Sequence, residues 1–143
     1  MGSGYSGYTH TKGAIERFKP QKLMDELKNS GVKYNEKDVI LVAKNYEGKL
    51  LWLEKGNGGA GLRHIIERHK KDFDPQINIL DLLMKILPTK PIKHFSRARD
   101  NRLELADVFL YKANSKIYLV AYGDNGYIVS FYPYGKGWYL CIK

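Results

Sequence analysis

The sequence predicts one α+β domain in which N-terminal helices pack on a twisted antiparallel sheet. Three observations point to this class. Helical and strand patterns occupy separate stretches of the chain instead of alternating along it. The C-terminal part holds several β-rich runs that are divided by short turn sequences such as Asp124-Asn125-Gly126. The chain is 143 residues long and 43% hydrophobic, which suits a single packed core.

The N-terminal part is expected to contain a linker and then a helix. Residues 1–12 are rich in Gly, Ser and Tyr, and we interpret them as a linker or an added tail before a single domain over 13–143. Apolar residues at helical spacing over 13–30 predict a helix that is interrupted at Pro20. The sequence Asn29-Ser30-Gly31 is typical of a helix end.

A β-hairpin and two further helices are expected next. The runs Val39–Ala43 and Leu50–Leu53 are joined by a turn sequence, which predicts antiparallel pairing. A glycine-rich turn then leads into a short helix that carries His64 and His69. Residues 77–88 predict another helix, whose apolar stripe is typical of a helix that faces the core.

The remaining chain is expected to form a basic loop and then an antiparallel meander. Residues 88–102 contain prolines and lack periodicity, which predicts a loop. The β-rich runs after it lie at 105–110, 117–122 and 127–134. Residues 138–142 predict one last short strand.

Composition restricts the class of function. Twenty-four Lys and Arg against fifteen Asp and Glu give a net charge of +9. This charge favours a polyanionic partner such as RNA, DNA or an acidic protein, although many small proteins carry as much charge for solubility alone. The single cysteine, Cys141, excludes an internal disulfide and a cysteine-based metal site. No apolar run is long enough to span a bilayer and no signal-peptide pattern is found, so no membrane partner is expected.

The short helix after the glycine-rich turn contains the main candidate site. At about 100° per residue, Leu62, Ile65 and His69 share one face, whereas His64 lies off that face near Arg68. We therefore expect His69 to face the sheet and His64 to leave the packed face. A histidine on an apolar face is commonly a hydrogen-bonded structural residue, and an exposed one commonly has no role.

Two features of this stretch favour chemistry. Gly58, Gly59 and Gly61 allow the backbone to approach a ligand closely, and a helix N-terminus favours anions. Histidines beside arginines and lysines also supply what RNA cleavage without a metal requires: one group removes the 2′-OH proton, another protonates the 5′-oxygen, and cations stabilise the phosphate. A zinc site is less well supported, because the histidine spacing is not i,i+4 and no third ligand is evident. No metal and no cofactor are expected.

A family resemblance covers this stretch. The segment GNGGAGLRHIIERHKKDF resembles a segment of bacterial and phage toxin nucleases of the barnase/EndoU/colicin/RelE-like superfamily, which includes toxin domains of contact-dependent growth inhibition systems and other polymorphic toxins. A second, shorter segment, NGYIVSFYP, is similar to a late strand of such proteins. The two segments frame residues 56–133. The resemblance implies an antiparallel sheet packed against helices, with the active site on the sheet face near the helix end.

The resemblance also implies a function and its residues. It implies a ribonuclease toxin, often one that cleaves tRNA, which is secreted or surface-presented as part of a larger effector and acts in the cytoplasm of a target cell. It implies an acidic cognate immunity protein that blocks the site, and it leaves open whether a host activating protein is needed. By position, His64, Arg68 and His69 carry over from the first segment, and Ser130 and Tyr132 from the second.

The roles of these residues are only partly decided by the sequence. We expect His64 to be the general base, and His69 to be either the general acid or the residue that locks the helix to the sheet. Strand alternation places Ser130, Tyr132 and Tyr134 on one face of the strand. Val129 and Phe131 are then expected on the other face. This polar row is either a source of hydroxyl groups for the substrate or a solvated outer face.

Basic residues are the candidates for substrate binding. Arg68 and one of Arg97 or Arg99 are candidate phosphate clamps, because a guanidinium group binds phosphate in a bidentate manner. Arg102 lies in the same loop, and Lys70 follows His69. Any one of them is also explained as ordinary surface charge. The alternative function is a non-catalytic RNA- or protein-binding module with structural histidines, and a metal-dependent DNA nuclease is a third hypothesis.

Overall fold

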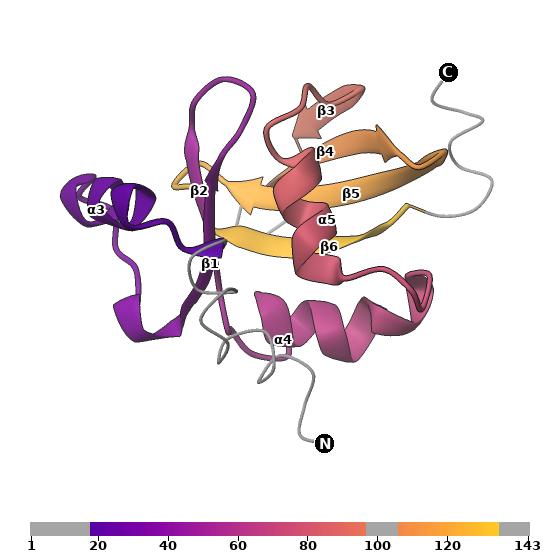
Figure 1. Cartoon of the computed structure of the whole chain (residues 1–143), viewed down its shortest axis with the longest axis horizontal. Coiled ribbons are helices and arrows are strands. Elements are labelled where there is room, and N and C mark those ends of the chain that lie inside the picture. The colour runs from indigo at the N-terminus through magenta and orange to yellow at the C-terminus, as the bar shows by residue number, and fades with distance from the viewer. Residues whose placement is uncertain (1–17, 97–105, 135–143) are drawn as a thin grey trace.

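Two antiparallel sheets and the helices against them make up the described part of the chain (Figure 1), which confirms the expected α+β class. The computed structural model describes residues 18–96 and 106–134. The elements follow in the order α3 (Gln21–Asn29), η1 (Glu36–Asp38), β1 (Val39–Lys44), β2 (Leu50–Glu54), α4 (Leu62–His64), η2 (Ile65–His69), η3 (Lys70–Asp72), α5 (Ile79–Ile86), β3 (Lys93–Ser96), β4 (Ala106–Ala113), β5 (Lys116–Gly123) and β6 (Ile128–Pro133).

The first described helix, α3, begins directly after Pro20, where the sequence predicted an interruption. The Ser30 hydroxyl donates a hydrogen bond of 2.7 Å to the Leu27 carbonyl and ends the helix. Gly31 follows with a φ of 85°, which a residue with a side chain rarely adopts. Leu27 is fully buried against β1 and β2, together with Val42 and other apolar residues, so α3 packs on the small sheet.

The hairpin of β1 and β2 is connected to the larger sheet and its turns by several hydrogen bonds, including one from the Asn45 side-chain NH₂ to the Tyr122 hydroxyl at 3.0 Å. Asn45 closes the hairpin turn, because its side-chain oxygen accepts from the amides of Glu47 and Lys49. Further along β2, the Trp52 amide donates to the Gly126 carbonyl at 2.9 Å, at the point where the chain enters β6. The structure therefore has two sheets, of two and four strands, where the sequence predicted one.

The larger sheet has the strand order β3-β4-β5-β6 and contains the predicted meander. Asn114 and Ser115 both have positive φ, 52° and 66°, which is typical of the two-residue turns that join antiparallel strands. The loop predicted for residues 88–102 is wrong at 93–96, which pair with β4 as the edge strand β3. This strand has only four residues and one partner, so no alternating apolar pattern marked it in the sequence.

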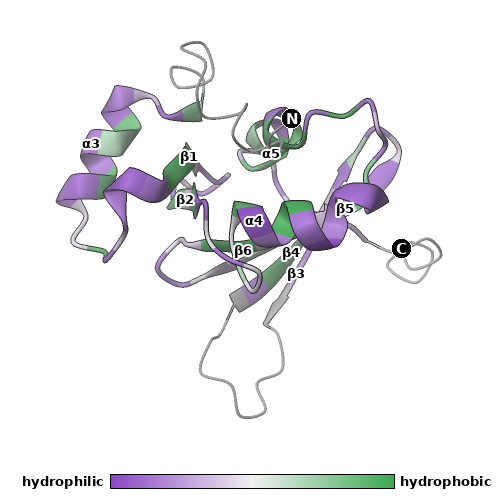
Figure 2. Cartoon of the chain, turned by 90° about the horizontal axis from the view of Figure 1, so that it is seen from below, coloured by the Kyte–Doolittle hydropathy of each residue, from purple (hydrophilic) through white to green (hydrophobic). Residues whose placement is uncertain are grey.

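Helix α5 confirms the helix predicted at 77–88, and it covers one face of the larger sheet (Figure 1). Its N-terminus is capped by Asn78, whose side-chain oxygen accepts from the Asp81 amide at 3.0 Å. Leu80 and Leu83 are fully buried in the main core, which also includes Phe131 of β6. Figure 2 shows the hydrophobic colour gathered in α5 and the strands, whereas α3 is largely hydrophilic.

The segment that carries the histidines is irregular and runs beside β6. Three α-helical residues, 62–64, are followed by a π-helical turn over 65–69 and a 3₁₀ turn over 70–72. None of the helices in the described ranges is long and apolar enough to cross a membrane. The predicted linker at 1–12, the predicted strand at 138–142, Cys141, and the arginines Arg97, Arg99 and Arg102 lie outside the described residues.

Candidate acid–base site on the histidine segment

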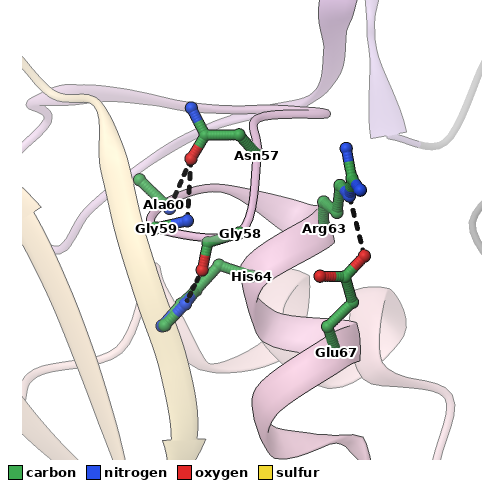
Figure 3. A network of polar contacts seen from close by, with 7 residues as sticks. All are labelled: Asn57, Gly58, Gly59, Ala60, Arg63, His64 and Glu67. Atoms are coloured by element: carbon green, nitrogen blue, oxygen red, sulfur yellow. Dashed lines mark hydrogen bonds and ion pairs between the residues drawn. The ribbon is translucent and has the colours of Figure 1, made fainter.

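A closed turn precedes the histidine segment. The side-chain oxygen of Asn57 accepts from the amides of Gly59 and Ala60 at 2.7 and 3.2 Å (Figure 3). The Asn57 amide also donates to the Ala60 carbonyl at 2.9 Å. Gly61 then has a φ of 87° and a ψ of −167°, a conformation that only glycine adopts without strain. Its amide donates to the Val129 carbonyl at 3.0 Å and so ties the start of the helix to β6.

These hydrogen bonds correct one expectation about the glycines. The amides of Gly59, Ala60, Gly61 and Arg63 all have protein acceptors, so they are not available to an anion. The glycines therefore shape the turn and hold the helix on the sheet, and these four amides are engaged within the protein.

The π-helical turn brings the two histidines together. In a regular α-helix, residues five apart point about 140° away from each other, which is why the sequence placed them on different faces. A π-helix bonds residue i to residue i+5, so side chains at this spacing come onto the same side. The rings of His64 and His69 lie with centroids 5.2 Å apart at an interplanar angle of 79°. The expectation that His64 leaves the packed face is therefore wrong.

His64 is oriented by the turn before it. Its Nδ1 lies 2.9 Å from the Gly58 carbonyl oxygen, and Figure 3 shows the ring directed to the β6 side of the helix, away from Arg63 and Glu67. A carbonyl oxygen can only accept, so Nδ1 carries the proton. In the neutral ring the lone pair is then on Nε2, which has no hydrogen-bond partner among the described residues.

His69 is oriented in the same way by an acidic side chain. Its Nδ1 lies 3.4 Å from Oδ2 of Asp72, a long hydrogen bond that again leaves Nε2 without a partner in the described part of the chain. Its ring stacks on Tyr132 of β6, with centroids 4.1 Å apart. Burial lowers the pKa of His69 below 6.5; the charges of His64 and Arg68 act in the same direction, and Asp72 opposes them.

The second segment of the resemblance contributes one of its two candidate residues to this site. Tyr132 is half-buried and contacts His69, as described above. Ser130 is only 7% exposed, and no described residue forms a hydrogen bond with its Oγ. The predicted row is also altered, because a β-bulge in β6 places Val129 with Tyr132 and Tyr134 instead of with Phe131. The row is therefore not a solvated outer face.

The described basic candidates lie on the exposed side of the same segment. Arg68 and Lys70 are exposed, as is Lys71. Arg63, in contrast, is bound to Glu67, with 2.7 Å between Nε and Oε2. Two of the predicted phosphate-binding residues therefore lie next to the histidines in the chain and are accessible to a large anion.

Sequence reasoning missed the groups that orient the histidines. Asp72 lies three residues after His69, and this i,i+3 spacing was a usable signal. The Gly58 carbonyl could not be found, because backbone groups leave no trace in residue types. A third histidine, His94, lies on β3, at the opposite edge of the larger sheet from β6. Its ring stacks on Phe109 of β4, with centroids 4.2 Å apart.

No group of three or more His, Cys, Asp or Glu side chains in the described ranges could hold a metal ion. Neither a protein-family model nor a curated protein matches the chain. The case for a function therefore depends on the geometry of His64 and His69.

Proposed function

We propose that the chain is a metal-independent endoribonuclease of the barnase/EndoU/colicin/RelE-like type, with His64 and His69 as its acid–base pair. The observation that carries the proposal is the arrangement of the two imidazoles. Their centroids are 5.2 Å apart, and each ring donates through Nδ1, so each Nε2 is left for proton transfer. General acid–base catalysis requires two such groups near one phosphate.

The two rings suit opposite roles. Because the rings are close, a positive charge on His64 disfavours protonation of His69. The lowered pKa of His69 favours its neutral form near pH 7, with the lone pair on Nε2. We therefore assign the general base to His69 and the general acid to His64, which reverses the assignment expected from the sequence.

The reaction follows from these assignments. Nε2 of His69 takes the 2′-OH proton, and the 2′-oxygen attacks the adjacent phosphorus. The bond from phosphorus to the 5′-oxygen breaks, and that oxygen receives the Nε2 proton of His64, which acts as the imidazolium and keeps its Nδ1 proton on the Gly58 carbonyl. The products are a 2′,3′-cyclic phosphate and a 5′-hydroxyl. Arg68 and Lys70 are exposed beside the pair and are the candidates that stabilise the charged phosphate.

Two neighbours act on His69 without touching the substrate. The Asp72 carboxylate holds Nδ1 and thereby fixes the tautomer, and the stacked Tyr132 ring fixes the plane of the imidazole. Ser130 is left out of the mechanism, because its hydroxyl is buried away from any substrate. Its place in the matched segment is explained by packing against β5, where it lies opposite Ala121.

The biological setting is part of the same proposal. We take tRNA as the substrate and an acidic immunity protein as the partner that covers the site. The net charge of +9 and the exposed Arg68, Lys70 and Lys71 support both, because they attract polyanions. Delivery within a larger effector and action in the cytoplasm of a target cell belong to the same type of toxin.

The test is to incubate the full chain with total tRNA in excess EDTA and to analyse the ends of the products. The proposal expects cleavage with 2′,3′-cyclic phosphate and 5′-hydroxyl ends. Intact tRNA that is nevertheless bound would support the non-catalytic binding module. Cleavage that appears only with a divalent cation, on DNA, would support the metal-dependent nuclease.

A further inference from the structure

A hollow of about 440 Å³ lies apart from the histidines, where the segment before η1 meets β2 and the turn into β6. Its aromatic lining consists of Tyr34, Trp52 and Tyr127, and its polar lining includes Lys33, Glu54 and Asn125. Neither histidine of the pair contributes to it. The hollow has the usual size of a small-molecule site and combines ring faces with a few polar groups.

The three aromatic rings are held rigidly. Trp52 is only 1% exposed and forms the floor, and its Nε1 donates to Oε2 of Glu54 at 2.9 Å. Tyr34 contacts Trp52 edge-on with centroids 6.4 Å apart, and Tyr127 contacts it at 5.7 Å. Both tyrosines are half-buried, so each keeps part of its ring surface open. Fixed tyrosines at an open hollow are suitable for stacking a planar ligand.

The polar groups leave one acceptor, one donor and one cation for a ligand. Oε2 of Glu54 accepts from the Asn35 amide as well as from Trp52, whereas Oε1 has no hydrogen bond among the described residues. The side-chain oxygen of Asn125 accepts from the Tyr127 amide, which leaves its NH₂ group as a donor. Lys33 is exposed at the rim and forms no ion pair within the described part.

We propose that this hollow binds one nucleobase of the RNA strand. The base stacks on the open surface of Tyr34, donates an N–H to Oε1 of Glu54 and accepts from Asn125, and a neighbouring phosphate lies near Lys33. The identity of the ligand rests on the proposed function. Tyr127 lies directly before β6 and precedes Tyr132 by five residues, a separation of up to about 17 Å at strand spacing. The bound base is therefore distant from the cleaved bond and sets the position of the strand relative to the histidines.

The test is calorimetric titration of the full chain with GMP, with AMP and with ribose 5-phosphate, which has the sugar and phosphate but no base. We expect the nucleotides to bind and ribose 5-phosphate to bind much more weakly. Tyr34→Ala should weaken nucleotide binding about tenfold, the loss of one stacking contact, whereas Tyr34→Phe should retain it. Glu54→Gln keeps an acceptor for Trp52 but removes the negative charge, and it should weaken the binding of GMP.

Three results would overturn the inference. They are equal affinity for GMP and ribose 5-phosphate, no binding of either nucleotide at millimolar concentration, or a Tyr34→Ala variant that melts like the wild type and binds like it. A mononucleotide has no bond to cleave, so this readout is independent of catalysis. If tRNA stays uncut while GMP still binds, the proposed nuclease function is wrong and the base-binding site stands. If tRNA is cleaved but binding does not depend on the base, only the base-binding site is wrong.

Discussion

Replacing Gly61 with alanine should detach the histidine segment from the sheet. Gly61 has a φ of 87° and a ψ of −167°, and its amide donates to Val129 on β6. A Cβ at this position would lie 2.8 Å from the Glu54 carbonyl oxygen and 2.9 Å from Cα of Gly56, both of them backbone atoms. The chain must therefore shift, and the shift moves the residue that precedes α4.

The expected cost has two parts. A non-glycine residue in this backbone region costs about 1–3 kcal/mol. Relief of the two overlaps costs about 1–3 kcal/mol more, as for other overpacked positions. The sum, about 2–6 kcal/mol, is a large fraction of the stability of a small domain, which is about 5–15 kcal/mol.

Gly58→Ala is the matched control in the same turn. A Cβ on Gly58 would have one neighbour, Oε1 of Glu67 at 3.8 Å, an ordinary contact. Urea denaturation of both variants measures the difference. We expect Gly61→Ala to lose at least about 2 kcal/mol and Gly58→Ala to stay within about 0.5 kcal/mol of the wild type. Equal losses in the two variants would show that the backbone at Gly61 is not the constraint described here.

Three further predictions concern single side chains. Asp72→Asn should lower the pKa of His69 further, because the carboxylate raises it; an NMR titration of the ring that shows no change or a rise would contradict this. The folded pKa of His69 lies below 6.5, so the unfolded chain binds more protons and stability should fall as the pH falls through 6.5, levelling off below the folded pKa. His69→Gln should remove this contribution in urea denaturation at pH 5 and pH 8, and an unchanged pH dependence would count against it. Ser130→Ala should leave tRNA cleavage unchanged and stabilise the fold by up to about 1 kcal/mol, since the buried Oγ has no partner among the described residues; a loss of more than that would reveal a bond to Oγ.

The strand and turn pattern could be predicted from local sequence. The turns at 45–48 and 114–115, the interruption at Pro20 and the helix at 77–88 each depend on residues within a few positions, and each is confirmed. Strand β3 could not be predicted, because its ladder is made by β4, more than ten residues later. The way the hairpin joins the larger sheet likewise depends on the long-range pairing of Trp52 with Tyr127.

The candidate site was predicted in its residue types but not in its geometry. A regular helix separates His64 and His69, and the π-helical turn that brings them together follows from packing on β6, which no local pattern records. The same applies to the stack of His69 on Tyr132. The glycines were correctly singled out, but their role depends on which amides find acceptors, and that is decided by the tertiary structure.

The most direct test of the acid–base pair compares rates of tRNA cleavage in EDTA for His64→Ala, His69→Ala, the double variant and His94→Ala. His94 lies at the opposite edge of the larger sheet and serves as the control. We predict that each single replacement in the pair lowers the rate at least about a hundredfold, that the double variant is hardly slower than either one, and that His94→Ala cleaves like the wild type. Cleavage at the wild-type rate by a correctly folded His64→Ala or His69→Ala variant would contradict the account.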